Sequence, residues 1–136
     1  MPHSKTSTGF TLIEMLLVLV ILVILGAIAV PLFQGIAEKS YQRSARIQVN
    51  AVETAIDNFY FALKRYPENL EELRVEPGDL QEAKQWDGPY MKQILADPWG
   101  NDYQYQFRGA HNSDSYDFWS YGPNGVNGDD DDIGNW

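Results

Sequence analysis

Residues 10–33 decide the fold: they read FTLIEMLLVLVILVILGAIAVPLF and carry a single charge, on Glu14. As an α-helix rising 1.5 Å per residue, this stretch would be about 36 Å long, which is enough to cross a bilayer with some tilt. Inserting an ionised carboxylate near the start of such a helix costs on the order of 3 kcal/mol. We therefore expect a transmembrane helix over 10–33 whose one acidic side chain needs a partner.

The nine residues before this helix have the character of a leader. They are polar, carry Lys5 and no acidic residue, and end in Gly9. A secretory signal has its small-residue cleavage site after the apolar region. Here the small residue comes first, so a cut after Gly9 would keep the helix on the mature protein. The cut would also create an ammonium group on Phe10, about one helical turn from Glu14, where the two charges could pair within a chain or between chains.

The junction Gly9-Phe10-Thr11-Leu12-Ile13-Glu14 resembles the class III leader junction of type IV pilins and the related pseudopilins. The resemblance implies that an inner-membrane prepilin peptidase cuts between Gly9 and Phe10 and methylates the new amine of Phe10. It also implies that Glu14 pairs with the amino terminus of a neighbouring subunit during assembly. The alternative interpretation is a signal-anchor helix with an incidental glutamate.

Composition predicts one membrane anchor and one small domain. The chain has 136 residues and no cysteine, so no disulfide can stabilise it. Ten basic residues stand against 19 acidic ones, a net charge of −9. Nucleic-acid phosphates need a basic surface, so this balance argues against a nucleic-acid partner.

Apolar residues continue at helical spacing beyond the membrane segment and mark one buried face. They are Ala45, Val49, Val52, Ile56, Phe59 and Leu63. Pro67 ends the pattern and favours an extended Tyr66, so the helix is expected to cover 10–66. We expect a kink or local melting near Pro31 and Gly35.

The rest of the chain predicts short helices followed by strands. Leu70 and Leu73 indicate one short helical turn, and residues 90–95 a second. Alternating aromatics predict a half-buried strand over 103–107, and a further strand is expected over 116–121. The fold class is therefore α+β, with the long N-terminal helix packed on a small antiparallel sheet, as in pilins. The DPWGN segment before the first strand (97–101) is similar to the major pseudopilin of type II secretion systems.

The C-terminal segment 121–136 combines glycines with four consecutive aspartates, 129–132. From the residues alone, a solvated acidic tail is the default, and Ca²⁺ bound through loop oxygens is the alternative. Major pseudopilins end in a similar loop that binds calcium, and the resemblance implies ligands at Tyr121, Asn124, Asp130 and Asp132. Asn124 stands where an aspartate is usual and the loop is shorter, so Asp129 or Asp131 could compensate.

Catalysis is not expected. His3 lies in the leader and His111 in a loop, and neighbours in sequence such as Ser113 and Asp114 do not make a triad.

The resemblance implies a three-part chain: a leader (1–9), a filament-core helix (10–33) and a periplasmic domain (34–136). Such a subunit would sit in the bacterial inner membrane as a single-pass protein. It would then polymerise into the periplasmic pseudopilus that exports folded proteins across the outer membrane. Its partners would be copies of itself, minor pseudopilins, the prepilin peptidase and the inner-membrane assembly platform. The alternatives are a type IV pilus major pilin for adhesion or motility, and a minor pseudopilin at the filament tip.

Overall fold

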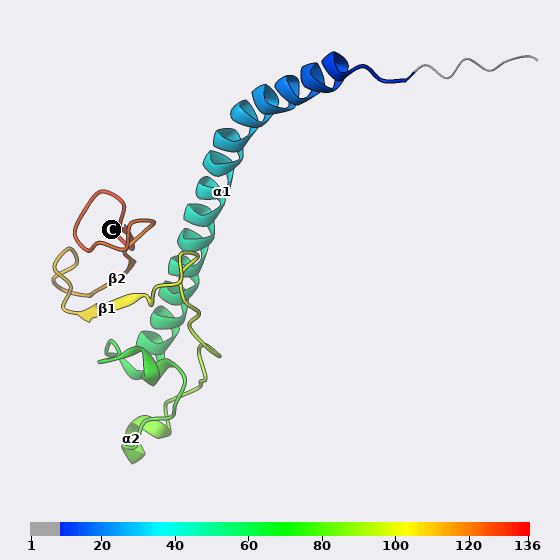
Figure 1. Ribbon diagram of the computed structural model, residues 1–136. Helices are drawn as coiled ribbons and strands as arrows, with labels where there is room; N and C mark the ends of the chain where they lie inside the picture. Colours follow the sequence, from blue (N-terminus) through cyan, green and yellow to red (C-terminus); the bar gives the residue numbers. More distant parts are fainter. Residues whose placement is uncertain (1–8) are drawn as a thin grey trace, which may run out of the picture. The chain divides into compact units, whose positions relative to one another are not determined.

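The computed structural model describes residues 9–136 and divides into two units, one ending at Ala37 and the other formed by Glu38–Trp136 (Figure 1). The predicted leader, apart from Gly9, lies outside the described residues. One helix, α1 (Leu12–Leu63), contributes to both units.

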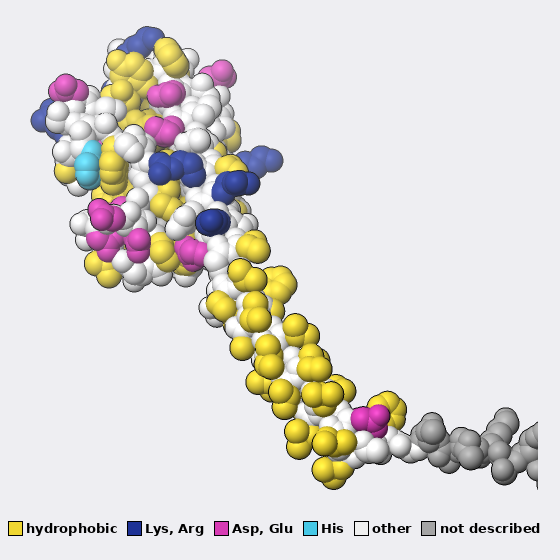
Figure 2. All heavy atoms as spheres, turned by 90° about the horizontal axis from the view of Figure 1, so that it is seen from above, with side chains coloured by type: hydrophobic (Ala, Val, Ile, Leu, Met, Phe, Trp, Pro, Cys, Tyr) yellow, Lys and Arg dark blue, Asp and Glu magenta, His cyan; other side chains and the backbone are white. Residues whose placement is uncertain are grey.

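The first unit is the apolar part of α1. Its large hydrophobic side chains are exposed. Figure 2 shows one face of this part, which hydrophobic side chains cover. An 18-residue window of α1 has a mean hydropathy of 3.2 and no buried residue, so this part is long and apolar enough to cross a membrane. The backbone stays α-helical through Pro31 and Gly35, so the melting expected there is not observed. Proline removes one backbone donor only, and the apolar residues on both sides continue the helix.

In the second unit α1 ends at Leu63, before the predicted end at Tyr66. The next residue, Lys64, adopts a left-handed conformation with φ 58, and its N–H donates to the carbonyl of Tyr60 at 2.8 Å. A left-handed residue just after the last turn is a common way to end a helix. The chain therefore leaves the helix before proline forces it to.

A three-stranded antiparallel sheet packs against the buried face of α1. Its order is β1 (Gln104–Phe107), β2 (Tyr116–Ser120), β3 (Ile133–Gly134). The central strand β2 is the most buried, and the ring of Phe118 stacks on Tyr103 with centroids 5.1 Å apart. The core contains the following residues: Ala45, Val49, Val52, Ala55, Ile56, Phe59, Leu73, Tyr103, Tyr116, Phe118 and Ile133.

Between helix and sheet the chain forms a 3₁₀ turn, η1 (Leu70–Leu73), and a short helix, α2 (Leu80–Ala83). The turn at Leu70 and Leu73 was predicted, but the second helix is at 80–83 and not at 90–95. Asp79 caps α2 by accepting the backbone N–H groups of Gln81 and Glu82. The N–H groups of Tyr90 and Met91 donate instead to the carbonyl of Leu73, which holds this segment in an extended course along the turn.

Candidate functional site

Two places in the described chain carry the features singled out in the sequence: the start of α1 and the loop between β2 and β3. Gly9 and Phe10 are exposed and precede the helix, which begins at Leu12. Both residues of the expected cleavage site are therefore accessible in extended chain next to the helix. Glu14 is exposed in the first turn.

Glu14 closes the first turn of α1 by a capping box with Thr11. Its Oε2 accepts the backbone N–H of Thr11 at 2.7 Å and the Thr11 hydroxyl at 2.9 Å. The Thr11 Oγ1 in turn accepts the backbone N–H of Glu14 at 3.3 Å. This reciprocal pattern satisfies two donors that the helix start would otherwise leave unpaired. Sequence reasoning treated Glu14 only as a charge, although the spacing of Thr11 and Glu14 is that of a capping box.

The capping bonds do not neutralise Glu14, because both Thr11 donors are uncharged. The carboxylate therefore keeps its negative charge next to the positive end of the helix dipole. Phe10 directly precedes Thr11, and its amide nitrogen would become an ammonium group if the chain were cut after Gly9. The geometry thus places a carboxylate and a potential amino terminus at the same end of one helix.

The loop 121–132 is organised around the amide of Asn124. Its Nδ2 donates to Asp129 Oδ2 at 2.7 Å and to Asp131 Oδ2 at 3.1 Å. Its Oδ1 accepts the backbone N–H of Val126 at 2.7 Å. Two carboxylate oxygens therefore converge on one nitrogen, which lies where a cation bridging the two aspartates would also have to lie.

Asp132 lies deeper in the same loop. One of its oxygens, Oδ2, accepts the backbone N–H of Gly128 at 2.8 Å. The other, Oδ1, is buried and has no hydrogen-bond partner among the described residues. A buried carboxylate oxygen without a partner is costly, so this atom is available to a ligand.

Of the four expected ligands, Asn124 and Asp132 face the interior of the loop as described. Asp130 is not among the acceptors of the Asn124 amide. Together with Asp131 and Asp132 it lines an open groove that also contains the basic side chains Lys39 and Arg43 of α1. Tyr121 follows β2 directly and is half-buried, with its ring 6.5 Å from that of Trp119. The structure thus groups Asn124 with Asp129 and Asp131, the two residues considered as substitutes.

The donor set of the loop fits a hard cation. Carboxylate, amide and carbonyl oxygens are the ligands that Ca²⁺ takes, six to eight at a time. Within residues 9–136, no three acidic or histidine side chains lie close enough to hold a metal ion by themselves. Main-chain carbonyls would therefore have to complete the coordination. The glycines of the loop let its backbone segments approach each other closely. A side chain at Gly122, for example, would collide with the carbonyl of Asp131.

His111 has a structural role in the described chain. Its backbone N–H donates to Asp117 Oδ2 at 2.8 Å, and its ring stacks on Trp136 at 3.8 Å. Burial alone would raise the pKa of Asp117, but hydrogen bonds from His111 and Asn112 lower this pKa below its usual value. The carboxylate thus holds a turn together.

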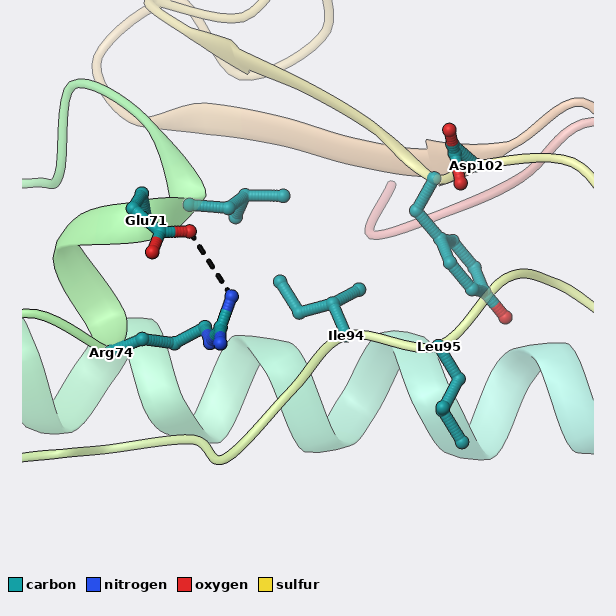
Figure 3. A pocket seen from close by; sticks show the side chains of 7 residues that line it. Glu71, Arg74, Ile94, Leu95 and Asp102 are labelled. Atoms are coloured by element: carbon teal, nitrogen blue, oxygen red, sulfur yellow. Dashed lines mark hydrogen bonds and ion pairs between the residues drawn. The ribbon is translucent and has the colours of Figure 1, made fainter.

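A shallow hollow of about 220 Å³ lies between η1 and the segments at residues 94–95 and 102–103. Figure 3 shows Arg74 and Glu71 at one end, joined at 3.2 Å, and Asp102 at the other. Ile94 and Leu95 line the space between them. The hollow thus combines an ion pair, aliphatic side chains and a further carboxylate, and we assign no site to it.

Comparisons with known proteins identify the family. The family model "Type II secretion system (T2SS), protein G" matches residues 33–136. The chain belongs to this family. The "prokaryotic N-terminal methylation motif" matches residues 4–30, which contain Gly9, Phe10 and Glu14. The protein G family consists of structural subunits.

Similar proteins extend over almost the whole chain. "Type II secretion system core protein G" of Aeromonas hydrophila is 39% identical, over 98% of this chain and 95% of that protein. The protein of the same name from Vibrio cholerae is 37% identical, over 100% of this chain and 96% of that protein. The crystal structure of the major pseudopilin from the type 2 secretion system of enterohaemorrhagic Escherichia coli has 32% sequence identity and a TM-score of 0.61. That match covers 76% of this chain and 92% of the other. The expected fold class and the resemblance to major pseudopilins are thereby confirmed.

Proposed function

We propose that this chain is cut after Gly9, methylated on Phe10 and polymerised into the periplasmic pseudopilus of a type II secretion system. In this role it helps to move folded proteins across the outer membrane. The observation that carries the proposal is the joint match of the methylation motif and the protein G family over nearly the whole chain. Before assembly, the apolar part of α1 anchors the subunit in the inner membrane, with Glu38–Trp136 in the periplasm.

The first unit supplies the physical basis of assembly. Its apolar side chains are exposed all round, so lipid and the helices of neighbouring subunits both provide a suitable apolar environment. In either environment an unpaired Glu14 carboxylate is unfavourable. Pairing with the methylated ammonium of a neighbour's Phe10 selects one register among the many that apolar packing alone allows.

A type IV pilus pilin remains the alternative with the same N-terminal chemistry. The relatives named core protein G favour secretion, as does the DPWGN turn at 97–101. The prepilin peptidase, minor pseudopilins and the inner-membrane platform are the partners that secretion requires. A chain in the pilus would instead serve adhesion or motility.

We further propose that the loop 121–132 binds Ca²⁺. Asp129 and Asp131 are supported by their convergence on one point, and Asp132 by its unpartnered Oδ1. Asn124 would have to turn its amide so that Oδ1, and not Nδ2, faces the cation. Tyr121 would contribute its carbonyl, and Asp130 is the least supported of the expected ligands. Bound calcium would neutralise part of the negative charge of the loop and join its start to its end.

Deletion of the gene tests the function. Exoproteins should accumulate in the periplasm, and the wild-type gene supplied in trans should restore their release. A chain with Gly9→Trp should not restore it, because the leader would stay attached, which a mobility shift on a gel reports. Normal secretion with lost surface motility would refute the secretion role and favour the pilus.

A further inference from the structure

The turn at residues 97–101 is built around a buried carboxylate. Asp97 is 5% exposed. Its Oδ1 accepts the backbone N–H groups of Trp99 at 3.1 Å and Asn101 at 2.7 Å. Its Oδ2 accepts the hydroxyl of Ser120 at the end of β2. One side chain therefore joins the turn to the central strand of the sheet.

Ser120 extends this connection into the acidic loop. It is completely buried, and its Oγ accepts the backbone N–H of Gly122 at 3.0 Å. A serine hydroxyl has one proton, which it donates to Asp97, so its lone pairs remain for Gly122. Gly122 in turn packs against the carbonyl of Asp131 near the other end of the loop. The chain of contacts runs from Asp97 through Ser120 to both ends of the loop.

The negative charge of Asp97 lies in the interior without a cation. No lysine or arginine of the part of the chain that is described forms an ion pair with it. Burial and the charge of Asp97 raise the pKa of Tyr103 to about 12. A buried charge costs several kcal/mol unless hydrogen bonds stabilise it. Asp97 has three such donors, two from its own turn and one from Ser120.

We infer that Asp97 is the positioning residue of the acidic loop 121–132. Its carboxylate accepts at both oxygens, which fixes the direction of the Ser120 hydroxyl and thereby the position of Gly122. An asparagine would present an NH₂ group to Ser120. The Ser120 hydroxyl would then lose its acceptor at residue 97, and its direction would no longer be fixed. This role belongs to Asp97 whether or not the loop binds a metal ion, and it does not rest on the calcium proposal.

The alternative is that Asp97 only stabilises its own turn, so that its loss would weaken the whole domain evenly. Asp117 provides a matched control. It is 2% exposed and also accepts backbone N–H groups from a turn, those of His111 and Asn112. None of its hydrogen bonds comes from residues 121–132.

Amide hydrogen exchange of the full chain in detergent micelles distinguishes positioning of the loop from stabilisation of the turn alone. It is measured by NMR with a chelator present. In Asp97→Asn and in Ser120→Ala, exchange at Gly122 should accelerate on the order of tenfold relative to the paired amides of β1 and β2. Asp117→Asn should leave this ratio as in the wild type. The double variant should match Ser120→Ala alone, because Asp97 acts on Gly122 only through the Ser120 hydroxyl, which alanine lacks. An unchanged ratio in Asp97→Asn, or an equal change in Asp117→Asn, would overturn the inference.

Calorimetric titration with Ca²⁺ on the same samples keeps the two proposals apart. If the wild type binds calcium, Asp97→Asn should weaken the affinity and Asp117→Asn should not. Equal affinity in wild type and Asp97→Asn would count against positioning. If the wild type binds no calcium, the calcium proposal fails, and the exchange ratio at Gly122 alone decides the role of Asp97.

Discussion

Replacing Asn124 by aspartate should convert the acidic loop from a self-closed loop into one that needs a cation. In the wild type the Asn124 amide donates to Asp129 and Asp131 at 2.7 and 3.1 Å. Asn124→Asp removes both donors and places a third carboxylate at hydrogen-bond distance from the other two. Two like-charge pairs at about 4 Å cost about 1 kcal/mol each in water. The calcium-free domain should therefore lose about 2 kcal/mol at low salt.

Thermal unfolding of the full chain in detergent, followed by near-ultraviolet circular dichroism, measures this loss. For a domain of this size, about 2 kcal/mol corresponds to a fall in Tm of roughly 8–16 °C. Calcium at 100 times its Kd would add about 2.7 kcal/mol and more than offset the loss. The variant should thus be less stable than the wild type in chelator and show the larger calcium-dependent rise in Tm.

Asn127→Asp is the matched control in the same loop. Asn127 Oδ1 accepts the indole N–H of Trp119 at 3.0 Å, a role that a carboxylate can keep. In chelator, the Tm of Asn127→Asp should fall much less than the Tm of Asn124→Asp. The reasoning is refuted if both variants lose the same stability, or if Asn124→Asp unfolds at the wild-type temperature without calcium.

Three further predictions concern other parts of the chain. Glu14→Ala should still be processed but should yield few filaments in shearing assays; abundant filaments would contradict the register argument. Lys64→Gly should raise stability by about 0.5–1 kcal/mol in urea unfolding, because Lys64 has φ 58; a loss of stability would show that the left-handed conformation is not strained. The folded-state pKa of Asp117 is lowered, so its contribution is present above its unfolded pKa, about 3.9, and is lost as the pH falls through the lower folded value. Wild-type Tm should therefore fall on acidification below about pH 4 more steeply than that of Asp117→Asn, and parallel curves would exclude this role.

The sequence predicted the parts of the fold that repeat. The apolar spacing from Ala45 to Phe59 marks the buried face of α1, because several turns of helix report the same side. Alternation of aromatics located β1 and β2 to within a residue at each end. The two-residue strand β3 is too short to alternate, and it forms only because β2 offers an edge.

The remaining differences between the predicted and the observed structure depend on single hydrogen bonds. Helix α2 begins where Asp79 caps it. Tyr90 and Met91, in contrast, donate their N–H groups to the distant carbonyl of Leu73, a pairing that no local pattern reveals. The acidic loop was predicted as a region, but four consecutive aspartates give no indication of which ones meet. The contacts of Asn124 depend on the backbone path set by the loop glycines. The buried link from Asp97 to Ser120 joins residues that are 23 positions apart and could not be read from either segment alone.

The capping box of Thr11 and Glu14 has a consequence for subunits that are not in a filament. A carboxylate that already holds local hydrogen bonds can exchange them for an ammonium group, and can take them back afterwards. With the proposed pairing of Glu14 and a neighbour's amino terminus, assembly would be an exchange between two hydrogen-bonded states of this carboxylate. Its net gain in free energy would be smaller than for a carboxylate without hydrogen bonds. A filament held in this way could lengthen and shorten reversibly. A subunit that returned from the filament to the membrane would re-form its capping bonds and could assemble again.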